Sequence, residues 1–220
     1  MDIVCYVFDG ITALDVVGPY EVLARLPGAD LRFVGEKVGP IRTDNQVLGI
    51  VADHARADVT SADVLVIPGG FATRNLERDT ALLEWIRAID ATSTWTTSVC
   101  TGSMLLAAAG LLEGKRATTH WASLDRLGEY GAIPTSERVV EQGKYVTAAG
   151  VSSGIDMALT LAGTIAGDEV AQAIQLSIEY DPQPPFDAGS VAKAPKAVVD
   201  LVSAVLAERQ RAVSGEPALD

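Results

Sequence analysis

Short runs of consecutive apolar residues alternate with longer segments of helical periodicity along the whole chain. These runs lack the polar–apolar alternation of a half-exposed strand. We therefore expect strands that are buried on both faces, as in a sheet packed between two layers of helices. The predicted strands cover residues 3–8, 31–34, 49–52, 64–68, 95–99, 117–120, 138–140 and 145–148. The predicted helices cover residues 17–26, 81–90, 102–112, 153–166, 169–180 and 197–211.

The order of these elements predicts an α/β fold. Strands that alternate with helices favour an open, mostly parallel sheet with helices on both faces. No internal repeat and no Gly/Ser linker divides the chain, and the one break in composition is the proline-rich segment 181–185 before the last helix. We therefore expect one domain that spans residues 1–220.

Composition and charge limit the classes of partner. Hydrophobic residues make up 48% of the chain and charged residues 21%, a balance that excludes intrinsic disorder. The net charge of −12 repels phosphate backbones and anionic lipid, so we expect neither a nucleic-acid nor a membrane partner. The longest apolar stretch, residues 104–112, is far shorter than a membrane span. No signal-peptide pattern is visible at the N-terminus, which predicts a cytoplasmic protein.

Cys100 lies where a predicted strand runs directly into a helix, in the segment SVCTGS of residues 98–103. A strand, a sharp turn and a helix with small flanking residues are typical of a nucleophile elbow. The positive end of the helix dipole is expected to lower the pKa of a thiol there. We favour a reactive Cys100 over a buried structural cysteine. Cys5 lies inside a buried strand, so we expect it to be inert.

Two further features follow predicted strands, at the sheet edge where ligands bind in open α/β folds. The backbone N–H groups of Gly70 and Thr101 could stabilise developing negative charge, although a simple strand-to-loop turn would also use a Gly-Gly pair. Asp15 lies between apolar residues after the first strand, where burial would raise its pKa and suit it to proton transfer. From the local sequence, a helix N-cap is the alternative for Asp15.

Histidine is scarce, and His120 ends a predicted strand at the edge where Cys100 is expected. It could approach Cys100 or satisfy a buried polar site, and the sequence leaves both possibilities open. No cluster of residues has the spacing of metal ligands, and no Gly-x-Gly-x-x-Gly follows the first strand. We therefore expect neither a metal nor a nicotinamide cofactor.

Four segments together resemble the ThiJ/PfpI superfamily. They are LDVVGP at residues 14–19, IPGG at 67–70, SVCTGS at 98–103 and ATTHW at 117–121. Within the superfamily the resemblance is closest to the isonitrile hydratases, also called isocyanide hydratases, and the run PPFDAGS at 184–190 is similar to that subgroup too. The resemblance extends from residue 3 to about residue 200.

This resemblance implies a flavodoxin-like α/β sandwich, a homodimer and no cofactor. It places the nucleophile on Cys100, the acid that hydrogen-bonds to it on Asp15, and the backbone donors on Gly70 and Thr101. In the hydratases the threonine after the cysteine also belongs to the site. The implied activity is hydration of an isocyanide to an N-substituted formamide through a cysteine thioimidate.

Departures from related branches disfavour other chemistries. The protease-like branch has a histidine directly after the cysteine, where this chain has Thr101. Class I glutamine amidotransferases complete a triad with a downstream His-x-Glu, whereas residues 149–154 contain no histidine. A regulator is disfavoured because the sequence ends at Asp220 without a pair of helix-turn-helix units. The alternatives that remain are glyoxalase or deglycase action on 2-oxoaldehydes and a non-enzymatic cysteine redox sensor.

Overall fold

The computed structural model describes residues 1–214, which form two compact units. The first unit is Met1–Ile178, and the second begins at Glu179. The expectation of one domain over residues 1–220 stays a prediction, and its last part, residues 215–220, lies outside the described residues.

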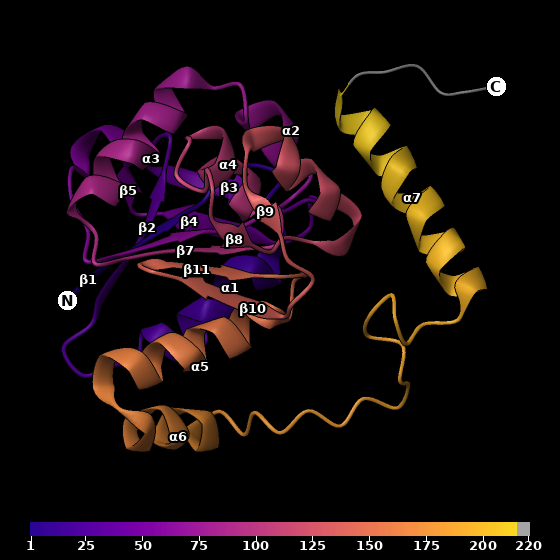
Figure 1. Ribbon diagram of the computed structural model, residues 1–220. Coiled ribbons are helices and arrows are strands. Elements are labelled where there is room, and N and C mark those ends of the chain that lie inside the picture. The colour runs from indigo at the N-terminus through magenta and orange to yellow at the C-terminus, as the bar shows by residue number, and fades with distance from the viewer. Residues whose placement is uncertain (215–220) are drawn as a thin grey trace. The chain divides into compact units, whose positions relative to one another are not determined.

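A seven-stranded sheet forms the centre of the first unit, with the order β10-β11-β7-β6-β1-β2-β5 (Figure 1). All neighbouring strands pair in parallel except β10, which runs antiparallel to β11. The mostly parallel sheet that the sequence predicts is thereby confirmed. The strands are β1 (Asp2–Tyr6), β2 (Asp30–Gly35), β5 (His54–Ala55), β6 (Val64–Ile67), β7 (Trp95–Val99), β10 (Val139–Gln142) and β11 (Tyr145–Ala148).

Helices cover both faces of this sheet (Figure 1). One face carries α2 (Thr73–Leu76), α3 (Thr80–Thr92) and α4 (Gly102–Ala108), and the other carries α1 (Ala13–Leu23), α5 (Ser153–Ala166) and α6 (Asp168–Ser177). This arrangement is the expected flavodoxin-like sandwich. The remaining elements of the first unit are two short ladders, β3 (Gly39–Arg42) with β4 (Gly49–Ala52) and β8 (Arg116–Ala117) with β9 (Ile133–Pro134), and the 3₁₀ segments η1 (Arg56–Asp58) and η2 (Trp121–Tyr130).

The central strands are apolar because both of their faces are covered. Every residue of β6 is buried, and so is β1 from Ile3 onward. The flanking helices are amphipathic instead: α3 starts at the N-cap Asp79, whose side chain accepts the N–H of Leu82, and it buries Ile86 and Ile89 toward the sheet.

The strand order reverses at β1, which has β2 on one side and β6 on the other. At such a switch point the connections leave on opposite faces of the sheet and open a crevice at the carboxyl ends of the strands. The loops after β1 and β6 are joined there by a bridge between Ile11 and Gly70. The functional site is therefore expected at this edge.

Two predicted elements at this edge were wrong in extent. The first helix begins at Ala13 instead of residue 17 and continues through Pro19, so Asp15 belongs to its first turn. The strand expected at residues 117–120 stops at Ala117, because the N–H of Thr118 and the hydroxyl of Thr119 are hydrogen-bonded to other segments. His120 therefore caps η2 and does not end a strand.

The second unit contains the helix α7 (Lys196–Ser214), which confirms the helix expected at residues 197–211. Lys196 and Asp200 form an ion pair of 2.6 Å one turn apart within it. Among the described residues, no helix of either unit combines the length and the apolar character that crossing a bilayer requires.

Candidate active site

Cys100 occupies the sharp turn between β7 and α4. Its φ of 57° lies in the left-handed region, which residues other than glycine rarely adopt. The backbone holds this conformation from both sides: the Cys100 N–H donates to the carbonyl oxygens of Ala148 at 3.1 Å and Ala149 at 2.8 Å, and its carbonyl accepts the Thr119 hydroxyl at 2.8 Å. At the helix start, a Cβ on Gly102 would overlap the carbonyl group of Ile67. The nucleophile elbow is confirmed.

Asp15 is fully buried beside this turn. Its Oδ2 accepts the N–H of Gly69 at 2.9 Å, and its carboxyl is hydrogen-bonded to the Cys100 thiol. Burial raises the pKa of Asp15 to about 7, against the opposing effect of these two hydrogen bonds. Because Thr12 is the N-cap of α1, the alternative that Asp15 caps the helix is wrong. The expected rise in the pKa of this acid is confirmed.

The thiol of Cys100 is protonated at neutral pH. Burial raises its pKa well above the ordinary value, and the Asp15 carboxylate raises it further, while the N–H groups of Thr101 and Val151 oppose both effects. The prediction of a lowered pKa is wrong, because burial of the side chain outweighs the lowering effect of the N–H groups at the helix start. The resting pair is thus a thiol next to a carboxyl group that can accept its proton during a reaction.

Gly69 and Gly70 bring the loop after β6 against the elbow. A Cβ on Gly69 would lie 2.6 Å from the Thr101 nitrogen and 2.8 Å from Asp15 Oδ2, so only glycine fits between these groups. The N–H of Gly70 donates to Thr101 Oγ1 at 3.0 Å. Gly70 and Thr101 therefore lie together at the site, as expected. Their role as donors to developing charge stays a prediction, since the Gly70 N–H is already bonded to the Thr101 hydroxyl.

His120 lies against the loop that follows β11. A Cβ on Gly150 would be 3.2 Å from His120 Cδ2, and the neighbouring Ala149 carbonyl binds the Cys100 N–H. The Nδ1 atom accepts the N–H of Ala122 at 3.3 Å, which leaves Nε2 to carry the proton of a neutral ring. Burial lowers the pKa of His120, so the ring is neutral at pH 7.

Three residues of the site were not identified from the sequence. Thr12 donates its N–H to the Gly69 carbonyl and its hydroxyl to Asp44, both at 3.0 Å, and Val151 directs its N–H at Cys100. A signal for Thr12 was present, because Thr three positions before Asp15 matches a helix-start pattern. Asp44 and Val151 lie in loops without a local motif, so only the fold brings them to the site.

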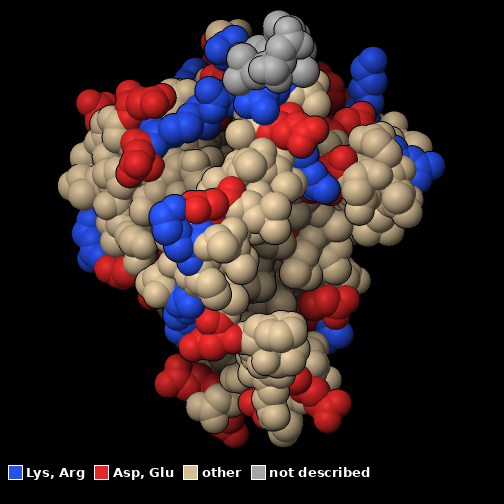
Figure 2. Space-filling view, turned by 90° about the vertical axis from the view of Figure 1, so that its right-hand side faces the viewer, with Lys and Arg blue, Asp and Glu red and all other residues tan. Residues whose placement is uncertain are grey.

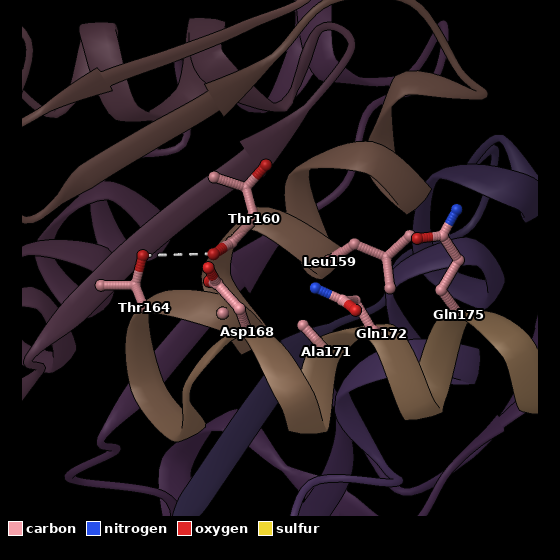
Figure 3. A pocket seen from close by; sticks show the side chains of 8 residues that line it. Leu159, Thr160, Thr164, Asp168, Ala171, Gln172 and Gln175 are labelled. Atoms are coloured by element: carbon pink, nitrogen blue, oxygen red, sulfur yellow. Dashed lines mark hydrogen bonds between the residues drawn. The ribbon is translucent and has the colours of Figure 1, made fainter.

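A hollow lies between α5 and α6, and none of the site residues described above lines it (Figure 3). It has a volume of about 410 Å³, and the Thr164 hydroxyl on its wall donates to the carbonyl of Thr160 at 3.1 Å. Its lining holds no cysteine or histidine, so it offers no nucleophile. The lining residues are Leu159, Thr160, Gly163, Thr164, Asp168, Ala171, Gln172 and Gln175.

Among residues 1–214, no group of three or more His, Cys, Asp or Glu side chains could hold a metal ion. On the face shown in Figure 2, Lys and Arg side chains are interspersed with Asp and Glu side chains.

The two cysteines should differ in reactivity. Both thiols are buried and have a raised pKa, but Cys5 is enclosed inside β1, whereas Cys100 lies in the turn after β7 next to a carboxyl group that can accept its proton. Brief treatment of the native protein with iodoacetamide, followed by peptide mass spectrometry, should modify Cys100 and leave Cys5 intact. Urea-denatured protein is the control and should be modified at both. Preferential modification of Cys5 in the native protein would refute the assignment of the reactive thiol.

Known proteins resemble this chain in sequence and in fold. The chain is 46% identical over 193 residues to an isonitrile hydratase of Pseudomonas putida. The matched residues cover 88% of this chain and 84% of that protein. It is 31% identical over 144 residues to the HTH-type transcriptional regulator CdhR of Pseudomonas aeruginosa, covering 64% of this chain and 42% of the regulator. The crystal structure of a ThiJ/PfpI family protein from Pseudomonas syringae superimposes with a TM-score of 0.91 at 36% identity, over 97% of this chain and 90% of that one.

The family assignment extends over most of the first unit. The model of the DJ-1/PfpI family matches residues 1–164, a range that contains Asp15, the Gly69–Gly70 loop, Cys100 and His120. We conclude that this chain belongs to the DJ-1/PfpI family.

Proposed function

We propose that the protein hydrates isocyanides to N-substituted formamides, with Cys100 as nucleophile and Asp15 as proton carrier. The observation that carries this proposal is the pairing of the Cys100 thiol with a buried carboxyl whose pKa is about 7. A carboxyl of this kind can both accept and release a proton near neutral pH. The similarity to an isonitrile hydratase supports the substrate class.

The first step adds the thiol to the terminal carbon of the isocyanide. Asp15 accepts the thiol proton as the Cys100 sulfur forms a bond to that carbon, and then delivers the proton to the lone pair of the same carbon. The product is a thioimidate in which the carbon bears sulfur, hydrogen and a double bond to nitrogen. No oxidant or reductant is needed, because the carbon gains one S–C and one C–H bond at the expense of the S–H bond and one C–N π bond.

The second step adds water to the thioimidate carbon. Asp15 accepts a proton from the water and passes it to the nitrogen, and the resulting tetrahedral intermediate carries a hydroxyl group. Its collapse breaks the C–S bond, returns the hydroxyl proton to the Cys100 sulfur and forms the formamide carbonyl. The Thr101 N–H, which already faces the sulfur, stabilises negative charge on it as it leaves.

Other groups complete the proposed site. Gly70 and Thr101 supply donors for charge that develops on the substrate, and the two steps require neither a metal nor a cofactor. The resemblance to the hydratases supports a homodimer that acts on a small molecule. A reducing compartment such as the cytoplasm would keep Cys100 in the thiol form.

His120 should support the reaction without being required for it. Its ring is neutral and its Nδ1 is bonded to the Ala122 N–H, while the proton transfers are assigned to Asp15. We expect His120→Gln to lose less than about tenfold in kcat, below the 10²–10⁴-fold typical of a positioned acid–base group. Steady-state rates with an aromatic isocyanide measure this. A loss as complete as that of Cys100→Ala would mean that the proton carrier has been misassigned.

A two-substrate assay separates this function from its rivals. The protein is incubated in parallel with an aromatic isocyanide and with methylglyoxal, and the formamide and lactate are quantified by chromatography. The proposal predicts formamide, and it predicts that any lactate forms far more slowly. Lactate without formamide would replace the hydratase by a glyoxalase. A redox sensor would turn over neither substrate and would show peroxide-sensitive Cys100.

A further inference from the structure

We infer that Asp44 is a positioning residue of this site, which acts through Thr12 to fix the place of Asp15 and supplies a fixed negative charge beside it. The inference rests on the proposed role of Asp15 as the proton carrier. Asp44 belongs to the loop between β3 and β4, and it is distant in sequence from the motifs that identify the family.

Thr12 links three segments at the site: the start of α1, the loop after β6 and the loop between β3 and β4. It is the N-cap of α1, with φ −79° and ψ 116°, but its side chain makes no capping hydrogen bond. The hydroxyl instead donates to Asp44 Oδ2 at 3.0 Å. The Thr12 carbonyl accepts the Asp15 N–H at 3.1 Å, and its N–H donates to the Gly69 carbonyl at 3.0 Å. The Thr12 hydroxyl, at the position that usually caps a helix, thus binds the Asp44 carboxylate from another loop. This hydrogen bond fixes the turn that carries Asp15.

Asp44 is itself held in place. Its backbone N–H donates to the Ile11 carbonyl at 2.9 Å, in the residue before Thr12. The preceding residue, Thr43, is buried and binds across the same loop, with its N–H and its hydroxyl both directed at the Leu48 carbonyl. The half-buried Asp44 carboxylate therefore has a defined position relative to the start of α1.

The charge of Asp44 acts on Asp15. Three groups act on the Asp15 carboxyl: the Cys100 thiol from the elbow and the Gly69 N–H from the loop after β6 through hydrogen bonds, and Asp44 from the β3–β4 loop through its charge. A like charge disfavours the ionised form of a carboxyl, so Asp44 adds to the effect of burial and helps Asp15 to hold the proton that the isocyanide carbon receives.

The test removes the charge of Asp44 and the hydrogen bond from Thr12 to Asp44 in separate variants. Asp44→Asn removes the charge and keeps an oxygen that accepts the Thr12 hydroxyl. Thr12→Val removes the hydroxyl group and keeps the shape of the side chain, whereas Thr12→Ser keeps the hydroxyl group. Asp9→Asn is the matched control, because Asp9 is an exposed carboxylate in the loop between β1 and α1 that accepts the Arg42 N–H at 2.7 Å and is not among the groups that act on Asp15.

The first readout is the pH dependence of Cys100 alkylation by iodoacetamide, which needs no isocyanide. The thiol and Asp15 titrate as a coupled pair, so removal of a nearby negative charge should move the whole profile to lower pH. We expect a shift of roughly 0.3–1 pH unit in Asp44→Asn, and less than about 0.2 unit in Asp9→Asn. Equal profiles for Asp44→Asn, Asp9→Asn and the wild type would overturn the inference.

The second readout is turnover of an aromatic isocyanide. Thr12→Val should lower kcat roughly tenfold or more with little change in KM, because Asp15 is displaced while substrate binding is kept, and Thr12→Ser should recover most of the loss. A kcat that falls equally in Thr12→Val and Thr12→Ser, or a change in KM without a change in kcat, would contradict a positioning role. If the wild type forms no formamide, the proposed function fails, and the alkylation profiles still decide whether Asp44 acts on the pair.

Discussion

Cys100→Ala is expected to lose isocyanide hydration by a factor on the order of 10⁴ or more in kcat. The reason is that the proposed reaction begins with a bond from sulfur to the isocyanide carbon, and no other nucleophile is assigned to the site. Asp15 carries protons and forms no bond to carbon in this scheme. Initial rates of formamide formation measure the loss, with the substrate concentration varied to separate kcat from KM.

Two controls show whether such a loss is chemical. Cys100→Ala keeps a Cβ at the same left-handed φ, so its circular dichroism and its melting temperature should remain close to those of the wild type. Cys5→Ala removes the other thiol from the interior of β1 and is expected to cost about 1–2 kcal/mol in free energy of unfolding, with kcat unchanged. Retention of activity within about tenfold in Cys100→Ala would exclude cysteine catalysis.

Asp15→Asn is expected to lose roughly 10²–10⁴-fold in kcat, the usual effect of removing a positioned acid–base group. The amide fills the same buried space and can accept the Gly69 N–H, but it can neither take the thiol proton nor return one. Rates measured on the isocyanide used for Cys100→Ala allow direct comparison. Turnover within a few-fold of the wild type would assign the proton transfers to another group.

The same substitution should stabilise the fold in a pH-dependent way. Because the pKa of Asp15 is raised to about 7 in the folded protein, the folded state keeps a proton that the unfolded state releases near pH 4. The contribution of the carboxyl to stability is therefore full below about pH 4 and is lost as the pH rises through 7. Asn carries no charge at any pH, so its advantage over the wild type should grow by roughly 2–3 kcal/mol between pH 5 and pH 8.

Urea unfolding of both proteins at the two pH values measures this difference. The expected combination, a more stable protein at pH 8 with far lower activity, is the signature of a buried carboxylate that is retained for catalysis. A stability difference that is the same at pH 5 and pH 8 would show that Asp15 ionises at its ordinary pKa in the folded protein.

The sequence predicted those features that depend on local pattern. Unbroken apolar runs such as β6 identify strands that are covered on both faces, and the junction of a strand, Cys100 and small residues identifies the elbow. The pairing of Asp15 with Cys100 came from the family resemblance, because the two residues are far apart in the chain and only the switch point of the sheet brings them together.

The features that could not be predicted depend on tertiary contacts. The pKa of the Cys100 thiol is raised because the side chain is buried, and the sequence around the elbow does not show which segments cover that side chain. The strand expected at residues 117–120 ends early because Thr119 bonds to the Cys100 carbonyl instead of extending a ladder. Asp44 was overlooked because its partner Thr12 lies on another loop.

The central claim is that the isocyanide becomes bonded to Cys100 before it is hydrated. A single-turnover experiment tests this directly: enzyme in excess over an aromatic isocyanide is quenched at increasing times, and peptide mass spectrometry is combined with quantification of the formamide. We predict a transient adduct on the peptide that contains Cys100, with the full mass of the isocyanide, which decays at the rate at which formamide appears. Formamide that accumulates while the Cys100 peptide stays unmodified at every time would contradict the mechanism.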